Sequence, residues 1–225
     1  MHIEPGVVTG VKMALGAATG SAAVIYAIRE SLNTIRASGF ASLAVRSLIA
    51  TIAVFIFFEV LPHFSVGVSE VHFILGSTLL LILGTAPAAI GLVLGLLIQG
   101  VFFAPSDLPQ FGMNVTTLLV PLFAIHALAR RIIAPGTAYV DLTYVQALKL
   151  STAYQGGVVL WVAFWAIYGH GFGAENLAGI ASFGAAYMLV VLIEPIADLA
   201  VLAGAKALNG LRGSGLVTPR LYDAG

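Results

Sequence analysis

Long apolar segments separated by short polar ones dominate this sequence and restrict what it can fold into. Of its 225 residues, 60% are hydrophobic and only 9% are charged, whereas soluble domains carry about 25% charged residues. A segment that crosses a bilayer must satisfy its own backbone hydrogen bonds, and an apolar α-helix of roughly 20 residues does so. The sequence therefore predicts an all-α, polytopic membrane helical bundle that forms a single domain over residues 1–225.

The apolar pattern predicts about seven transmembrane helices. In the first, Ala14, Ala18 and Ala22 recur every four positions, which gives the helix a face for close packing against another helix. The sequence Gly-Thr-Ala-Pro at 84–87 divides a longer apolar stretch into two short spans, and interrupted spans often line a site. The predicted spans cover about residues 7–28, 40–61, 72–85, 87–104, 113–128, 145–168 and 176–203.

The distribution of basic residues predicts the orientation of the bundle. Lys and Arg gather in the cytoplasmic loops of membrane proteins. With the N-terminus outside, the outer loops hold no Lys or Arg, Lys12 lies within the first span, and Arg46 and Lys149 lie just inside spans on the inner side. The inner loops then hold Arg29, Arg36, Arg130, Arg131, Lys206, Arg212 and Arg220, and the outer loops hold Glu4, Glu70, Asp107 and Glu175. We therefore expect the N-terminus outside and the C-terminus in the cytoplasm.

Composition and missing motifs exclude several kinds of chemistry. The chain has no Cys, so disulfides, iron–sulfur clusters and cysteine nucleophiles are impossible. A net charge of +0 without a basic cluster argues against nucleic acid as a partner. The sequence contains neither a P-loop nor a G-x-S-x-G elbow. We therefore expect no enzyme, and any ATP-driven transport would depend on partner subunits.

The opening residues Met1-His2-Ile3 can chelate a divalent metal ion. The α-amine of Met1 and the amide and imidazole nitrogens of His2 can bind one ion in fused rings, provided that Met1 is retained. We expect this, because the start MHIEPGVV lacks the basic residues of a signal peptide and His2 is bulky. A fourth nitrogen would complete the square plane that Ni(II) and Cu(II) favour. His72, at the outer mouth of the third span, is the strongest candidate; the alternative is an interfacial histidine that reaches lipid headgroups.

Other polar residues near the predicted outer face allow weaker hypotheses. Asn114, at the start of the fifth span, can orient a metal-binding imidazole or cap a helix N-terminus, and the sequence leaves both open. We interpret His63 as an exposed loop residue, His126 as structural, His170 as a loop residue and Asp107 as a solvated carboxylate.

Three motifs occur in order in the first half of the chain. The opening is M-H-I-x-x-G over 1–6, and a histidine follows the Ser-containing outer loop at 69–72. The third motif runs from 96–103 through Leu108 to 111–114. Together with a seven-helix topology and an outer N-terminus, these motifs resemble the cobalt/nickel permease family (CbiM/NikM). That family comprises the metal-specific substrate-capture (S) components of energy-coupling factor (ECF) ABC transporters.

The resemblance implies a site and a set of partners. Met1, His2 and His72 would bind Ni(II) or Co(II) as substrate in a nearly square plane, and Asn114 would support the site. The partners would be an ECF coupling transmembrane subunit, ATPase subunits and a small accessory membrane subunit, in the lipid bilayer of the bacterial cytoplasmic (inner) membrane. The small-residue face of the first helix would contact the coupling subunit.

The sequence departs from the family pattern at two positions, and two other classes of function remain as alternatives. Glu70 stands where a small hydroxyl residue is expected, and Thr117 stands where a second Asn is expected, so nickel and cobalt both remain open. One alternative is a metal-independent transporter or channel for a small solute, in which Met1-His2 has no role. The other is an intramembrane hydrolase that uses Ser77 or Ser182 with an inward histidine.

Overall fold

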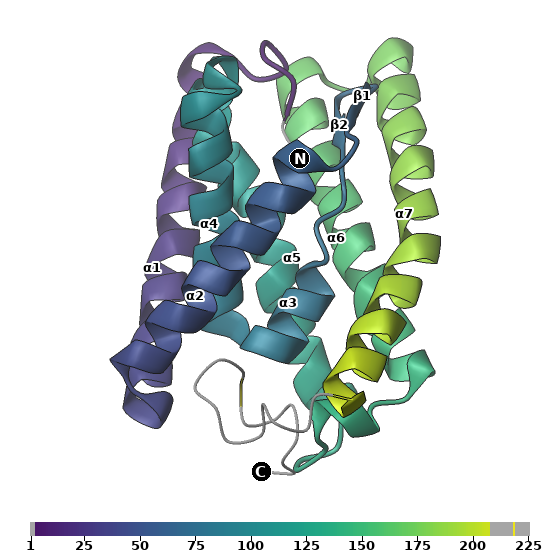
Figure 1. The fold of residues 1–225 in the computed structure, drawn as a ribbon. Helices are drawn as coiled ribbons and strands as arrows, with labels where there is room; N and C mark the ends of the chain where they lie inside the picture. The colour runs from purple at the N-terminus through teal and green to yellow at the C-terminus, as the bar shows by residue number, and fades with distance from the viewer. Residues whose placement is uncertain (1–2, 208–217, 219–225) are drawn as a thin grey trace.

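The computed structural model describes residues 3–207 and Thr218, and in this part of the chain seven α-helices pack into one bundle (Figure 1). The predicted all-α membrane fold is therefore confirmed. The helices are α1 (Met13–Ser38), α2 (Phe40–Phe55), α3 (Gly76–Leu83), α4 (Thr85–Phe102), α5 (Phe111–Ile132), α6 (Tyr144–His170) and α7 (Ala174–Ala207). Short 3-10 turns η1 (Gly10–Lys12), η3 (Pro105–Gln110) and η4 (Tyr139–Asp141) and the π-helical turn η2 (Ile56–Val60) extend or connect them.

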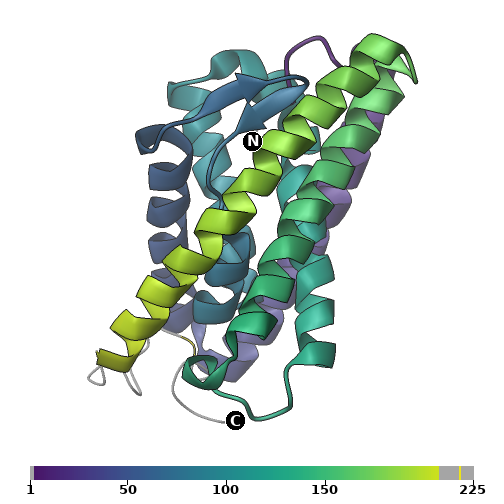
Figure 2. The same cartoon turned by 90° about the vertical axis from the view of Figure 1, so that its right-hand side faces the viewer.

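A small β-hairpin covers one end of the bundle, which we call the hairpin end. Its strands β1 (Phe64–Val66) and β2 (Ser69–Val71) pair antiparallel, with Phe64 opposite Val71. Gly67, at φ +63, makes the turn in a conformation that favours glycine. Figures 1 and 2 both place the hairpin beside the start of α7, and α7 ends at the opposite end of the bundle.

The third crossing of the bundle is only partly helical. The expected span at 72–85 contains α3, whose eight residues extend roughly 12 Å at 1.5 Å per residue. The four residues before α3 have no regular structure, and Leu75 has φ 51, which is unusual for a residue other than glycine. Such backbone is tolerated at membrane depth only where protein covers it. Here His72 and Ile74 are buried.

A buried arginine closes α3 at the opposite end of the bundle. Arg46 of α2 donates from Nη1 to the Leu83 carbonyl at 2.9 Å and from Nε to the Ser42 carbonyl at 3.2 Å. A cation at the C-terminus of a helix is favourable, because the last carbonyls of the helix carry partial negative charge. Near the same end, the Thr85 hydroxyl and His126 Nδ1 lie 2.9 Å apart, which agrees with the structural role expected for His126.

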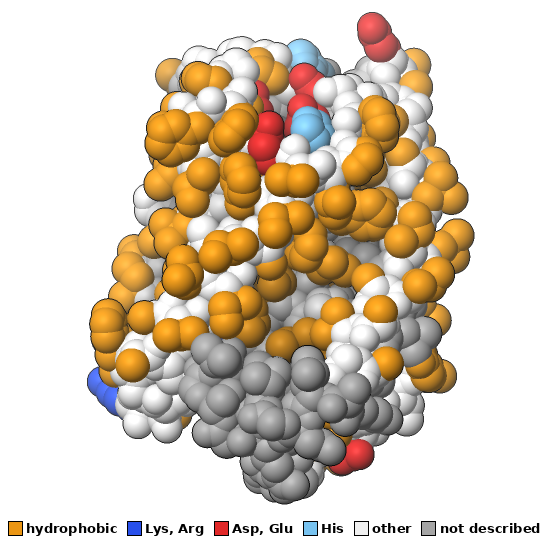
Figure 3. All heavy atoms as spheres, in the orientation of Figure 1, with side chains coloured by type: hydrophobic (Ala, Val, Ile, Leu, Met, Phe, Trp, Pro, Cys, Tyr) orange, Lys and Arg blue, Asp and Glu red, His pale blue; other side chains and the backbone are white. Residues whose placement is uncertain are grey.

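The surface of the bundle is that of a multi-pass membrane protein. Apolar side chains cover its middle, and histidine and acidic side chains gather at the hairpin end (Figure 3). Large hydrophobic side chains, whose exposure to water is unfavourable, lie on the surface of α1, α2, α4, α6 and α7. Within the described residues, five helical stretches are long and apolar enough to cross a membrane: Gly10–Ser38, Phe40–Val60, Thr85–Phe102, Pro105–Ile132 and Tyr144–His170.

Glycines bring two pairs of helices into close contact. Gly91 of α4 packs against the backbone of Ala50 in α2, and Gly20 of α1 packs against Gly112 at the start of α5. Because these positions lack a Cβ atom, the helix backbones approach closely, as small residues commonly allow in membranes. The alanines at 14, 18 and 22, by contrast, lie on the exposed face of α1.

The contact between α2 and α4 predicts a stability difference between two substitutions. In Gly91→Ala, the added Cβ atom would lie only 2.8 Å from the Ala50 carbonyl carbon, and overpacking of this kind costs about 1–3 kcal/mol. In the control Gly156→Ala on α6, the added Cβ atom has no neighbour within 4 Å. We expect thermal unfolding in detergent to show that only Gly91→Ala lowers the midpoint; equal midpoints for the two variants would contradict this packing.

Candidate metal centre

The first described residue is held against the hairpin. Ile3 is fully buried and forms an antiparallel bridge with Ser69 of β2. The Glu4 N–H donates to the Val68 carbonyl at 3.3 Å. The chain thus enters the bundle as a short extension of the hairpin, and its position is set by backbone pairing.

Asn114 of α5 holds Ile3 from another side. Its Oδ1 atom accepts a hydrogen bond of 2.8 Å from the Ile3 N–H, and its side chain is buried, with 1% of the residue exposed. Because α5 begins at Phe111 with Gln110 at the N-cap position, Asn114 does not cap the helix. Its amide instead connects α5 to the start of the chain, 111 residues away in sequence.

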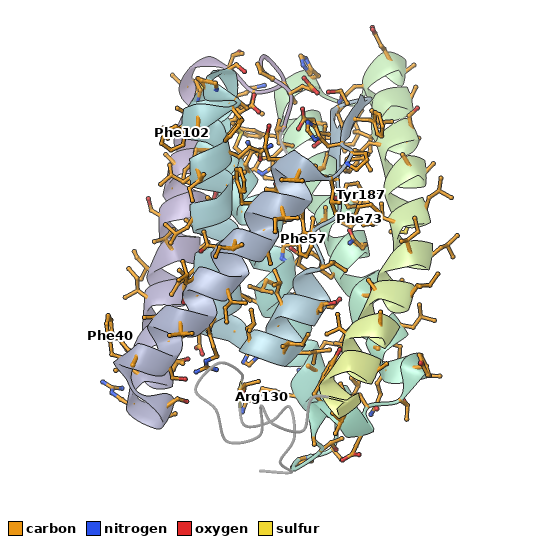
Figure 4. The ribbon with its side chains drawn as sticks, in the orientation of Figure 1. Phe40, Phe57, Phe73, Phe102, Arg130 and Tyr187 are labelled. Carbon is orange, nitrogen blue, oxygen red and sulfur yellow. The ribbon has the colours of Figure 1, made fainter. Side chains whose placement is uncertain are left out.

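His72 follows β2 directly and lies inside the bundle. It is 1% exposed, and its ring packs against Phe58 of η2 in a T-shaped arrangement with the ring centroids 4.7 Å apart. Its carbonyl accepts a hydrogen bond of 2.9 Å from the Tyr187 hydroxyl. Figure 4 shows Tyr187 reaching from α7 toward the segment that carries Phe73. The backbone and the ring of His72 are therefore both positioned by neighbouring elements.

Two further side chains lie close to the His72 ring. The Oε2 atom of Glu70 is 3.8 Å from His72 Nε2. The ring of His63 is 6.1 Å from the His72 ring, and its Nδ1 atom lies 3.3 Å from the Leu61 carbonyl. A carbonyl can only accept, so Nδ1 carries the proton in that bond and Nε2 of the neutral ring keeps its lone pair. The expected exposed His63 is in fact half-buried beside His72.

Gln99 of α4 supports the same region from within the apolar core. Its Nε2 atom donates to the Phe58 carbonyl at 3.3 Å, which helps to hold the ring that packs against His72. Its Oε1 atom is buried and has no hydrogen-bond partner among the described residues. Buried polar groups rarely stay unsatisfied, so this oxygen marks a place where a donor fits.

The described residues do not form a complete metal site by themselves. Within 3–207 and at Thr218, no group of three or more His, Cys, Asp or Glu side chains converges in a way that could hold a metal ion. Met1 and His2, two of the predicted ligands, lie outside the described residues. Asn114 bonds Ile3, the first described residue, and His72 follows three residues after Ser69, which pairs with Ile3.

Three further residues considered in the sequence form local contacts or lie at the surface of the bundle. The Thr117 hydroxyl donates to the Met113 carbonyl in its own helix at 2.9 Å. His170 is exposed at the end of α6 and lines a pocket of about 610 Å³ with Val7 and Glu175. Asp107 lies in η3, where its Oδ1 accepts from the Ser106 hydroxyl at 3.3 Å.

Sequence reasoning missed two residues that support the candidate centre. Gln99 is a polar residue inside a membrane span, and that alone is a signal of a functional or structural partner. Tyr187 offers no such signal, because tyrosine is common in membrane helices, and only the packing of α7 shows that its hydroxyl reaches the His72 carbonyl.

Comparison with known proteins identifies the family of the chain. The CbiM family model, described as the cobalt uptake substrate-specific transmembrane region, matches residues 2–209. A search of curated proteins and a search of solved structures each gave no match. Because the matched region includes nearly all of the described bundle and its hairpin end, the chain belongs to the CbiM family of cobalt-uptake transmembrane components.

Proposed function

We propose that this protein captures Ni(II) or Co(II) at the hairpin end through Met1, His2 and His72, for import driven by the ATPase subunits of an ECF transporter. The α-amine of Met1 and the amide and imidazole nitrogens of His2 provide three nitrogen ligands, and the His72 imidazole provides the fourth. Four nitrogens in a plane suit Ni(II) in particular. The proposal requires that the chain begins at Met1 in the cell.

The observation that carries this proposal is the position of Ile3. Its bridge with Ser69 is antiparallel. In an antiparallel pair, the residues that precede Ile3 therefore run in the same direction as the residues that follow Ser69. His72 is three residues beyond Ser69 on that path. The two residues ahead of Ile3 can span at most about 7 Å. Their nitrogen atoms therefore have only a short distance to cover to approach His72.

The hydrogen bond from Ile3 to Asn114 supports the same assignment. It engages the first amide nitrogen that the chelate does not use, at 2.8 Å. A chelate of three nitrogens gains affinity when its backbone is already held in place, because less conformational entropy is lost on binding. The Gln99 amide supports the same assignment, because it bonds the carbonyl of Phe58, whose ring packs against His72.

The orientation and surface of the bundle fit a role as a capture subunit. By the distribution of basic residues, the hairpin end faces the outside of the cytoplasmic membrane. The exposed small residues Ala14, Ala18 and Ala22 of α1 leave space for a helix of the coupling subunit.

A hydrolase is a weaker candidate, because the Ser182 hydroxyl donates to the Ala178 carbonyl of its own helix at 2.9 Å.

The α-amine of Met1 is expected to be essential for binding. We predict that a Gly-Ser-Gly extension ahead of Met1 lowers the affinity for Ni(II) and Co(II) by more than about 100-fold, because it moves the amine out of the chelate ring. A single added residue is unsuitable, since a histidine in third position chelates Ni(II) by itself. Titration calorimetry on purified protein measures the affinity, with the same three residues appended at the C-terminus as the control. Tight one-to-one binding by the extended protein would refute the site.

Replacement of His72 tests the fourth ligand. We expect His72→Ala to weaken Ni(II) binding by more than about 100-fold, since loss of a direct ligand exceeds the 10- to 100-fold effect of outer-shell residues. The control is His170→Ala, which removes an exposed imidazole from the same end of the bundle. Metal analysis after equilibrium dialysis would contradict the assignment if both variants retained one equivalent of metal.

Asn114 is expected to act through the start of the chain. Asn114→Leu keeps the side-chain size but removes the acceptor for the Ile3 N–H, and we predict metal binding about 10- to 100-fold weaker. Thr117→Val is the matched control, because it removes a buried polar group one turn further along α5 that bonds only locally in its helix. Equal affinities of the two variants for Ni(II) would show that Asn114 has no such role.

A further inference from the structure

Glu70 and His72 present their side chains to one another from the same stretch of chain. Glu70 lies in β2, where it pairs with Ser65, and His72 follows two residues later. Residues two apart in an extended chain point to the same side. Glu70 Oε2 lies 3.8 Å from His72 Nε2, and the side chains are 24% and 0% exposed, respectively. The carboxylate is thus held beside a buried imidazole.

The distance between these two atoms suits a shared metal ion better than a direct hydrogen bond. An N–H···O hydrogen bond in a protein measures about 2.7–3.2 Å, and the observed 3.8 Å is longer. Two ligand atoms at about 2.1 Å from one ion lie roughly 3 Å apart at a right angle and roughly 4.2 Å apart on opposite sides. The observed separation of 3.8 Å falls between these limits, so one ion can contact both atoms.

Charge balance in the buried site also favours a carboxylate ligand. A divalent ion bound by one deprotonated backbone amide retains one positive charge, and three neutral nitrogens do not change it. A buried charge without compensation is costly. One carboxylate makes the ion and its ligands neutral. Among the described residues, Glu70 has its carboxylate within ion-pair distance of the His72 ring.

We propose that Glu70 is a fifth ligand of the captured metal and that it makes the site accept Co(II). This inference rests on the proposed capture site at Met1, His2 and His72. An oxygen outside the plane of four nitrogens removes the square-planar geometry on which the advantage of Ni(II) depends. The resulting five-coordinate site, with mixed nitrogen and oxygen ligands, discriminates less between the two ions. Glu70 is therefore a specificity-determining residue.

The substitution Glu70→Gln tests this role at nearly constant size, because a neutral amide is a much poorer metal ligand. Titrations with CoCl₂ and NiCl₂ should show Co(II) affinity reduced by at least about tenfold, a loss comparable to that of a supporting ligand. Ni(II) affinity should change much less. The control Glu175→Gln removes the same charge from an exposed position in the first turn of α7. It should leave both affinities unchanged.

X-ray absorption of the loaded protein provides a readout that a purely electrostatic role would not change. We expect the wild type to bind Co(II) with five ligands including oxygen, and Glu70→Gln to lose one of them. Equal losses of Co(II) and Ni(II) affinity with unchanged coordination would overturn the proposal and leave Glu70 as an electrostatic neighbour. If the wild type binds neither ion, or if the protein with the Gly-Ser-Gly extension binds the ions as tightly as the wild type, the capture site itself is refuted. That result is distinct from a failure of the Glu70 proposal.

Discussion

The hydrogen bond between the Ile3 N–H and Asn114 joins the first described residue to a buried side chain of α5, and the proposed metal site builds on it. The ends of a chain are usually poorly ordered unless other groups hold them. Here Ile3, close to one end, is held by a backbone bridge to β2 and by the buried side chain of Asn114 in α5. Asn114 lies in the first turn of α5, which packs closely against α1 where Gly112 meets Gly20. Helix packing within the membrane thus supports the geometry at the bundle end.

The third crossing shows how a helical bundle can present a strand-like segment at membrane depth. A hydrocarbon environment does not satisfy exposed backbone groups, so the residues between β2 and α3 need protein partners. The Tyr187 hydroxyl supplies one by donating to the His72 carbonyl. At the far end of α3, Arg46 satisfies the carbonyl of Leu83, the last residue of the helix. The extended segment places the side chains of Glu70 and His72 on one side of the chain. Both can therefore face the start of the chain.

Much of the fold followed from the sequence, while the detail of the hairpin end did not. Hydropathy predicted the membrane class and the all-α bundle, because a bilayer imposes a length and a composition on each span. It did not reveal that the segment at 72–85 is helical only from Gly76 to Leu83, since an apolar run looks alike in a helix and in a buried extended chain. The hairpin also escaped prediction, because its strands are three residues long and lack a clear alternation.

The candidate ligands Met1, His2 and His72 were predicted from chemistry that short stretches of sequence carry: a terminal amine, an adjacent imidazole and a histidine at the edge of a span. Those predictions remain to be tested by metal binding. The sequence by itself determined the membrane class, the distribution of charge between the two ends and the available donor atoms, because each depends on local composition. Only the tertiary structure decided that Ile3 pairs with Ser69, that Asn114 holds its amide and that Glu70 faces His72. Contacts between Ile3 and distant residues depend on how helices pack, and the Glu70–His72 contact depends on an extended conformation that the hairpin imposes.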